Sequence, residues 1–295
     1  MKLPERRQPD FSNFEYPDLS EYLTRDGLTP EGVKKFRALI GNFYRQYGRE
    51  FLWRQTTDPY KIVVSEVMLQ QTQTDRVIYK FAHFIEAFPD FKTLAAASFV
   101  DVLVYWHGLG YNRRALFLHK IAQRVMRDFG GILPDSPDIL VAFNGLGPAT
   151  AASICAFAFN KPVLFIETNI RAVFIHTFFG KDSEKISDKA IMPLMQATLD
   201  HENPREWYYA LTDYGVVLKK LYKNPSRRSA HYAKQSAFEG SERQIRGMIL
   251  RVLTAHKKAT FKNLCALISR EPERIKNNLA ALLKDGLIKQ WFGQF

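Results

Sequence analysis

The segment that decides the fold is Phe143–Val173, which reads FNGLGPATAASICAFAFNKPVLFIETNIRAV. It opens with Gly145 and Gly147, which stand one residue apart and directly ahead of a helical pattern. Glycine lets the backbone approach a partner closely, and the unpaired N–H groups at the start of the next helix suit a phosphate. An apolar run then ends at the carboxylate of Glu167. A phosphate clamp followed by a half-buried acid predicts chemistry on a nucleic acid, whereas the simpler interpretation is a helical hairpin followed by a capping cluster.

The positive charge of the chain is concentrated at one end. The 295 residues carry a net charge of +12 at pH 7, and residues 219–295 hold 17 Lys or Arg against 5 Asp or Glu. The first 218 residues therefore contain 25 charges of each sign and are formally neutral. A one-sided basic surface of this kind is typical of nucleic-acid-binding proteins and, less often, of proteins that bind anionic membranes.

The cysteines and the N-terminus indicate a cytoplasmic protein. Cys155 and Cys265 are the two cysteines of the chain, far apart and each in an apolar helical context, so we predict neither a disulfide framework nor a zinc site. The first residues, MKLPERRQPDF, lack an apolar signal core, and no apolar run reaches membrane-spanning length. We expect a monomer that works in the cytoplasm at the nucleoid, with no membrane partner.

Apolar residues recur at helical spacing along almost the whole chain, and strand alternation is nearly absent. We therefore predict an all-α protein made of an N-terminal arm (1–30), a helical core (31–226), a basic linker (227–240) and a small C-terminal module (241–295). Helices are predicted over 30–43, 59–71, 77–88, 91–97, 99–106, 113–129, 138–143, 170–179, 187–199 and 207–214.

The C-terminal module resembles a winged helix-turn-helix domain. Its three short helical patterns begin at Ser241, Thr260 and Glu271, and the last is stopped by Gly286. The apolar pairs that follow, Leu287–Ile288 and Trp291–Phe292, predict a small ribbon. Strong basic charge and this order of elements fit a DNA-binding module, although other small helical bundles give the same pattern.

Glu66 is a carboxylate in an unexpected place. Its neighbours at helical spacing include Ile62, Val63 and Leu69, so it lies on the apolar face of an apolar helix. Burial of a carboxyl group is costly unless the group is paired or protonated, and it raises the pKa toward the range in which a general acid works at neutral pH. The alternative is a core glutamate that bonds a helix terminus or an arginine.

The same helix ends in an amide-rich run, Gln70-Gln71-Thr72-Gln73. Amides at this place would contact base edges or fill the gap left by an extruded base, as base-flipping enzymes require. Alternatively, they cap the helix.

Glu167 is the second carboxylate, and two acids that flank one pocket can cleave a glycosidic bond. One protonates the leaving group, while the other stabilises an oxocarbenium-like transition state or attacks it. An N-glycosidic bond to a base needs the same division of labour, and a base within a duplex must first be flipped out.

Three motifs occur here in the order of the A/G-specific adenine DNA glycosylases, which belong to the helix-hairpin-helix base-excision superfamily. They are SEVMLQQT at 65–72, WHGLGY at 106–111 followed by Arg114 and LHK at 118–120, and the glycine hairpin at 145–147. The resemblance covers about residues 45–220. It implies a two-lobed helix-hairpin-helix glycosylase fold and double-stranded DNA with a mispaired or damaged base as partner.

The resemblance also implies site residues. Glu66 is expected to protonate the adenine ring, and Glu167 falls where the family has its aspartate, with Asn169 as its polar helper. Gln71 is expected to enter the base stack and Tyr111 to intercalate next to the opposing base. Arg54 is expected near the base pocket, where Trp53 offers a ring for stacking. The full set of expected DNA contacts is Gln70, Gln71, Thr72, Tyr111, Gly145, Gly147, Ala149, Lys219, Lys220, Arg227 and Arg228.

Four departures from the family pattern bear on function. Glu167 is one methylene longer than the usual aspartate, which changes where its carboxylate lies. Ala149 stands where the lyase branch carries a Schiff-base lysine, so we expect a glycosylase without lyase activity. The four cysteines that bind an iron–sulfur cluster in most relatives are absent after Tyr214, so no cofactor is expected. Relatives often end in a β-rich domain that reads 8-oxoguanine, whereas this chain ends in a basic helical module.

The sequence thus predicts a monofunctional DNA glycosylase of base excision repair that removes adenine from A:G or A:8-oxoguanine mispairs. Two alternatives stay open: a thymine or uracil mismatch glycosylase of the same superfamily, and a DNA-binding protein with impaired catalysis. We expect the basic residues at 219–228 to bind DNA phosphates and to give an affinity for DNA that weakens as the salt concentration rises. The alternative is that they form a solvated basic surface.

Overall fold

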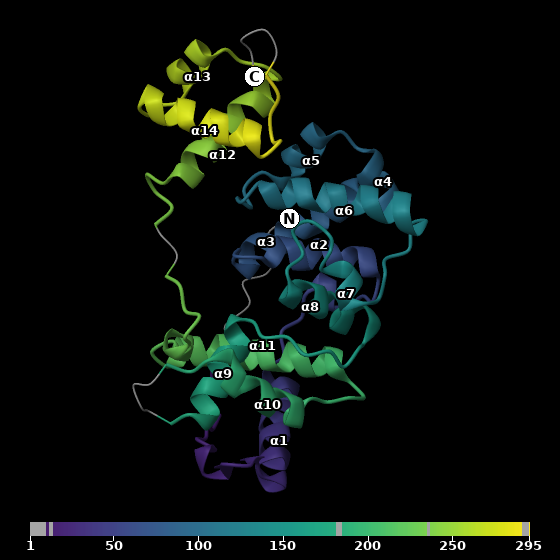
Figure 1. Ribbon diagram of the computed structural model, residues 1–295, viewed down its shortest axis with the longest axis vertical. Coiled ribbons are helices and arrows are strands. Elements are labelled where there is room, and N and C mark those ends of the chain that lie inside the picture. Colours follow the sequence, from purple (N-terminus) through teal and green to yellow (C-terminus); the bar gives the residue numbers. More distant parts are fainter. Residues whose placement is uncertain (1–9, 12–13, 181–184, 235–236, 291–294) are drawn as a thin grey trace. The chain divides into compact units, whose positions relative to one another are not determined.

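The computed structural model describes residues 10–11, 14–180, 185–234, 237–290 and 295 (Figure 1). Fourteen α-helices make up the fold in this part of the chain, and the one ladder between named strands there joins β1 (Leu23–Thr24) to β2 (Gly27–Leu28). The predicted all-α class is confirmed. No helix among these residues is both long enough and apolar enough to cross a membrane.

The helices follow the predicted order along the chain. Their bounds are α1 (Pro30–Tyr47), α2 (Pro59–Leu69), α3 (Thr74–Ala87), α4 (Phe91–Ala96), α5 (Phe99–Trp106), α6 (Arg113–Phe129), α7 (Pro137–Leu140), α8 (Pro148–Phe159), α9 (Thr168–Phe178), α10 (Asp188–Thr198), α11 (Pro204–Leu221), α12 (Glu242–His256), α13 (Phe261–Leu267) and α14 (Pro272–Lys284). Three 3-10 turns complete the set: η1 (Ser20–Tyr22), η2 (Leu52–Arg54) and η3 (Pro225–Arg228).

Local sequence explains where several helices begin. The side chains of Thr29, Asp58, Ser98, Ser241 and Thr260 each accept a hydrogen bond from a backbone N–H in the first turn of the helix that follows. These caps satisfy N–H groups that have no partner within the helix. α5 and α6 match their predicted bounds, but α11 continues to Leu221 instead of ending at residue 214.

Contacts divide the chain into two units, and the first consists of residues 1–50 and 155–233. In this unit α11 packs against α1 and α9. Asp213 on α11 is 1% exposed and accepts hydrogen bonds from both the backbone N–H and the guanidinium of Arg49, at 2.7 and 2.8 Å. A buried carboxylate needs such a partner because desolvation of an unpaired charge is costly.

The described part of the N-terminal arm packs on the same unit. The ring of Phe14 makes edge contacts with Phe43 and Tyr47, and Tyr16 stacks on Tyr214 with ring centroids 5.6 Å apart. The described residues of the arm therefore lie over the core of this unit.

The second unit consists of residues 51–154 and 234–295. α2 lies in its interior, and Ile62, Val63, Val64, Val67 and Met68 are at most 1% exposed, as expected for a helix that is apolar almost all round. The apolar core of α12–α14 is continuous with Leu116 of α6 and with the α5 side chains Phe99 and Leu103. The predicted domains are consecutive segments of the chain, whereas each contact unit combines two separate segments. The predicted boundaries stay a prediction.

The three helices expected in the C-terminal module are present as α12, α13 and α14. Leu287 and Ile288 are not in a strand, and Trp291–Phe292 lie outside the described residues. Phe295 exchanges two backbone hydrogen bonds with Ala259, at 3.0 and 3.2 Å. The resemblance to a winged helix-turn-helix therefore stays a prediction.

Candidate active site

Glu66 lies on α2 between the buried residues Ser65 and Val67, and its own side chain is half-buried. The hydroxyl of Ser153, on α8, donates a hydrogen bond of 2.5 Å to Oε2 of Glu66. Ser153 is 4% exposed, and its hydroxyl also lies 3.0 Å from the carbonyl of Thr150. Because a serine hydroxyl carries one hydrogen, it serves only one of these acceptors at a time. The hydroxyl is thus placed to orient the carboxyl group of Glu66, a partner that the sequence analysis missed.

Arg114 organises the exit of α2. It is 7% exposed, and its Nη1 donates to the carbonyl oxygens of Val67, Met68 and Gln70, which have no partner within the helix. A cation at this end also interacts favourably with the helix dipole. Burial lowers the pKa of Arg114 to about 10, so the guanidinium is still protonated at neutral pH. This arginine follows the WHGLGY motif, and its residue type alone indicated no role for it.

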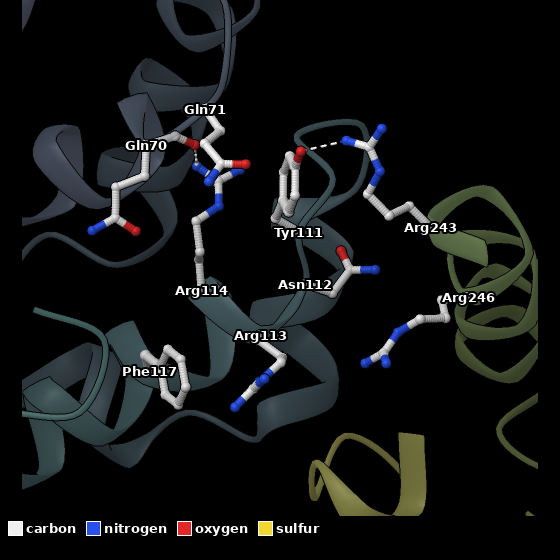
Figure 2. A pocket seen from close by; sticks show the side chains of 9 residues that line it. All are labelled: Gln70, Gln71, Tyr111, Asn112, Arg113, Arg114, Phe117, Arg243 and Arg246. Atoms are coloured by element: carbon white, nitrogen blue, oxygen red, sulfur yellow. Dashed lines mark hydrogen bonds between the residues drawn. The ribbon is translucent and has the colours of Figure 1, made fainter. Parts of the chain in front are cut away.

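Arg114 also positions the two residues predicted to enter the base stack (Figure 2). Its Nη2 donates to the Thr72 hydroxyl at 2.8 Å and to the carbonyls of Leu109 and Gly110 at 3.2 Å. Gln71 and Tyr111 flank these anchor points and have positive φ angles of 54° and 46°. Non-glycine residues rarely adopt that conformation, which persists only where the surroundings impose it. One buried arginine therefore fixes both loops, and it leaves Gln71 exposed and Tyr111 half-buried.

Gln70 links two of the segments that surround Glu66. Its amide Nε2 donates to the carbonyl of Gly145 at 3.2 Å and lies 3.3 Å from the hydroxyl of Thr150. The side chain thus ties the end of α2 to the glycine turn before α8. Its expected contact with base edges stays a prediction. Thr72, likewise, accepts from Arg114 and serves the same loop structure.

The two glycines of the hairpin have different requirements. Gly145 has a φ of +92°, and a Cβ atom there would lie 2.6 Å from the side chain of Phe117. Gly147 meets nothing within 4 Å at the corresponding position. Gly145 is therefore dictated by the fold, whereas Gly147 stands at an open surface directly before α8. Ala149 is exposed on the first turn of that helix.

Glu167 caps the N-terminus of α9. Its Oε1 accepts from the backbone N–H of Ile170 at 3.1 Å, and its Oε2 accepts from the side-chain amide of Asn169 at 3.1 Å. Burial raises the pKa of Glu167, and the N–H groups of Asn169 and Ile170 and the charge of Lys219 act in the opposite direction. Glu167 and Asn169, which the sequence analysis paired, are therefore in direct contact.

Lys219 completes this cluster from α11. Its Nζ donates to Oδ1 of Asn169 at 3.0 Å. α11 comes this close to the start of α9 because residue 215 is glycine: a Cβ there would lie 2.3 Å from the carbonyl oxygen of Asn169. Lys219 therefore acts within the cluster of Asn169 and Glu167, and its expected role in phosphate binding stays a prediction. The sequence prediction had ended α11 at residue 214, before Lys219.

The other predicted basic contacts divide into two kinds. Arg228 donates from its guanidinium to the carbonyls of Phe179 and Gly180, just beyond α9, so it holds this part of the fold. Its expected contact with DNA stays a prediction. Lys220 and Arg227 are exposed. The backbone carbonyl of Arg227 accepts a hydrogen bond from Nζ of Lys185 at 2.8 Å. This bond does not involve the side chain of Arg227, which lies on the surface.

Trp53 and Arg54 lie on η2. Trp53 is 4% exposed, stacks on Phe51 with centroids 4.7 Å apart and meets the edge of Phe81 at 5.5 Å. This packing makes Trp53 a core residue, and its expected role as a stacking surface for a base stays a prediction. The guanidinium of Arg54 lies over the ring of Phe51, and its carbon is 5.1 Å from the ring centroid.

The cysteines do not suit an iron–sulfur cluster. Such clusters require four thiolates, and the chain has Cys155 on α8 and Cys265 on α13. Within the described residues, no group of three or more His, Cys, Asp or Glu side chains is arranged to hold a metal ion. The expected lack of a cofactor stays a prediction.

Comparison with known proteins identifies the family. Residues 64–197 match the model of the HhH-GPD superfamily base excision DNA repair proteins. The chain is 33% identical over 267 residues to an adenine DNA glycosylase of Mycobacterium tuberculosis, covering 83% of this chain and 88% of that protein. It is 35% identical over 188 residues to an adenine DNA glycosylase of Buchnera aphidicola, covering 62% of this chain and 52% of that protein.

A solved structure supports the fold. A thermostable thymine-DNA glycosylase superposes with a TM-score of 0.58 at 26% sequence identity, covering 63% of this chain and 86% of that one. The predicted helix-hairpin-helix glycosylase fold is confirmed. The chain belongs to the HhH-GPD superfamily of base excision DNA repair proteins and, within it, to the adenine DNA glycosylases.

Proposed function

We propose that this protein is a monofunctional DNA N-glycosylase of base excision repair that removes adenine from A:G or A:8-oxoguanine mispairs in double-stranded DNA. The observation that carries the proposal is the carboxyl group of Glu66, set in an apolar helix and hydrogen-bonded by Ser153. Its setting suits a residue that donates a proton to a base as the base leaves. The family of the chain supports adenine as that base.

The protonation step acts on the leaving group. Adenine departs as a neutral molecule only if a ring nitrogen gains a proton while the bond to the sugar carbon breaks. Glu66 supplies that proton and becomes a carboxylate. Water then adds to the sugar carbon and loses a proton, which leaves an abasic site.

We assign to Glu167 the stabilisation of the positive charge that develops on the sugar. A carboxylate stabilises an oxocarbenium-like transition state electrostatically or attacks it directly. The N–H groups at the start of α9 and the charge of Lys219 favour the ionised form of Glu167 against its burial. Asn169 holds one of its oxygens, so the carboxylate is kept in one orientation.

DNA binding precedes this chemistry. We assign Gln71 and Tyr111 to the gap in the base stack, since both are presented on loops that Arg114 fixes. Gly147 and the first N–H groups of α8 are assigned to a DNA phosphate. Ala149 carries no amine, so the Schiff-base route of a lyase is not available at that position. We expect the protein to act as a monomer at the nucleoid.

A second candidate function changes the base that is removed. The superposition on a thymine-DNA glycosylase favours thymine or uracil opposite guanine as the alternative. Four labelled duplexes separate the candidates: A opposite 8-oxoguanine, A opposite G, T opposite G and U opposite G, each incubated with protein and then cleaved with alkali at abasic sites. Release from the A duplexes supports the proposal, and release confined to the T or U duplexes refutes it.

Variants test the assigned acid. Glu66→Gln should lower the single-turnover rate of adenine release by about 10²- to 10⁴-fold, because an amide cannot donate this proton. Glu86→Gln, on the exposed face of α3, is the matched control and should keep the rate. Full activity of Glu66→Gln would overturn the mechanism. Failure of borohydride to trap a covalent protein–DNA adduct would support the monofunctional assignment.

A further inference from the structure

α14, drawn in yellow in Figure 1, has one side exposed and the other packed into the core of the C-terminal module. After its first residue, the exposed positions recur at the spacing of one helix face: Glu273, Lys276, Asn277, Ala280 and Lys284. The opposite side includes Ile275 and Leu282, which are fully buried among apolar residues of α12 and α13. Packing therefore fixes which side chains α14 presents to solvent.

Two lysines stand on this exposed side, and neither is paired with an acid. Lys276 and Lys284 make no ion pair with another residue of the part of the chain that the structure describes. In contrast, four of the five acidic residues after position 219 pair with an arginine: Glu239 with Arg270, Glu242 and Glu271 with Arg274, and Asp285 with Arg246. Arginines therefore neutralise these acids within the fold, and the charge of the two lysines remains on the surface.

The separation of the two lysines fits the backbone of a DNA duplex. The eight residues from Lys276 to Lys284 rise by about 12 Å along the helix axis. The major groove of B-DNA is also about 12 Å wide. A helix that lies across this groove therefore brings one lysine to each phosphate strand. Ala280 stands between the two lysines, so only a methyl group projects toward the DNA at that point.

The start of α14 indicates that the contact does not extend to the bases. In helix-turn-helix proteins, residues at the N-terminal end of the recognition helix contact base edges in the major groove. Here that end carries the exposed carboxylates of Glu271 and Glu273, which the phosphates of the groove walls repel. The lysines, which lie further along the helix, contact phosphates alone, and such contacts hold a protein on DNA without reading its sequence.

An anionic membrane is a poorer fit to this surface than DNA. Helices that lie on membranes carry Trp, Phe or Leu beside their basic residues. Every residue of α14 is described, and none of its exposed side chains is bulky and apolar. Charge without apolar anchors favours a duplex as the partner.

We propose that the exposed side of α14 is a second DNA-binding surface, on which Lys276 and Lys284 bind phosphates of undamaged duplex DNA. The proposal rests on the proposed function for its partner, since a DNA glycosylase must find rare mispairs in a large excess of paired DNA. It goes beyond that function because no residue assigned to the reaction lies on α14. Contacts with phosphates alone give affinity for any sequence and let a protein slide along DNA. The C-terminal module thus serves the search for a mispair.

Binding to undamaged duplex at a series of salt concentrations tests this surface. Fluorescence anisotropy gives Kd of the full chain, and the logarithm of the association constant falls with the logarithm of the salt concentration by about 0.9 for each phosphate contact. Lys276→Met/Lys284→Met should lower this slope by about 1 to 2 and weaken binding at low salt about tenfold. An unchanged slope in this double variant would overturn the proposal.

Two further variants separate this surface from general charge. Lys34→Met/Lys92→Met removes the same charge from exposed positions on α1 and α4, and it should keep the wild-type slope. Lys276→Arg/Lys284→Arg keeps the charge on α14 and should keep the slope as well. An equal fall in slope for both methionine variants refutes the proposal, because net charge alone would then explain the binding. Circular dichroism of each variant confirms that the fold is intact.

Vesicles test the membrane as the other source of phosphate. Wild-type protein should sediment equally little with vesicles of phosphatidylcholine and with vesicles that contain phosphatidylglycerol. Binding to the anionic vesicles that is lost in Lys276→Met/Lys284→Met, together with an unchanged DNA slope, would assign the surface to a membrane and overturn the proposal.

Adenine release at saturating protein, measured in parallel, keeps the two hypotheses apart. Lys276→Met/Lys284→Met should keep the wild-type single-turnover rate, because neither lysine is assigned to the reaction. Adenine release by the wild type with an unchanged slope in the variant refutes the inference and leaves the proposed function standing. A lower slope in the variant, with no release by the wild type from any duplex, refutes the proposed function and retains the DNA-binding surface.

Discussion

Lys219 Nζ donates a hydrogen bond of 3.0 Å to Oδ1 of Asn169. This contact decides the orientation of the amide: because the oxygen faces the ammonium group, the NH₂ group faces Glu167 and donates to Oε2 at 3.1 Å. Lys219 therefore acts on the carboxylate in two ways, through the amide it orients and through its charge, which lowers the pKa of Glu167 against the effect of burial.

Replacing this lysine should change the pH dependence of the reaction. In Lys219→Met the opposing charge is lost, so the pKa of Glu167 rises further and the carboxylate becomes protonated at a higher pH. The acid limb of the single-turnover rate profile should move to higher pH. Lys220→Met, which removes the exposed lysine next to it, should leave that limb in place. An unshifted limb in Lys219→Met would show that the charge does not act on Glu167 during the reaction.

Ser153 provides a second test of a positioning residue. Ser153→Ala removes the hydroxyl that donates to Glu66, so the acid loses one restraint on its orientation, and the single-turnover rate should fall about tenfold or more. Ser65→Ala is the matched control, since Ser65 is also fully buried but donates to the carbonyl of Ile62 at 2.9 Å. If both variants lose rate equally, the effect is one of packing and not of orientation.

Helical spacing was enough to predict the class and the order of the elements. Ser98 caps the start of α5, and Gly130, with a φ of 60°, ends α6. α11 lacks such a stop signal at residue 214, because Val217 and Leu218 continue its buried face. The predicted end there was wrong, so Lys219 was not expected on this helix.

Some residues of the candidate site could be singled out from the sequence and others could not, and the reason is physical. Glu66 and Glu167 were found because a carboxylate next to an apolar run is anomalous within the sequence itself. Partners such as Ser153 and Lys219 are ordinary residues 87 and 52 positions away along the chain, and their roles exist only after folding. The same reason explains why the contacts that Arg228 and Trp53 make within the fold could not be predicted from residue type.

Arg114 should dominate the stability of the second unit. Arg114→Lys places a compact ammonium group where a planar fork now meets several carbonyls, so most of those acceptors lose their partner. We expect a loss of about 3 kcal/mol in the free energy of unfolding. Arg113→Lys, at the exposed neighbouring position, should change it by less than about 0.5 kcal/mol. Urea denaturation followed by circular dichroism measures both, and equal effects would contradict the role given to Arg114.

The hairpin glycines allow structure and DNA binding to be separated. Gly145→Ala combines an unfavourable positive φ with a Cβ atom 2.6 Å from Phe117, so we expect a loss of about 2 kcal/mol in the free energy of unfolding. Gly147→Ala has open space around its Cβ and should leave that free energy unchanged. If a DNA phosphate approaches the backbone at this glycine, the added methyl group should weaken duplex binding in anisotropy titrations at constant salt. Unchanged affinity of Gly147→Ala would place the phosphate elsewhere, because the fold itself gives this position no other reason to lack a side chain.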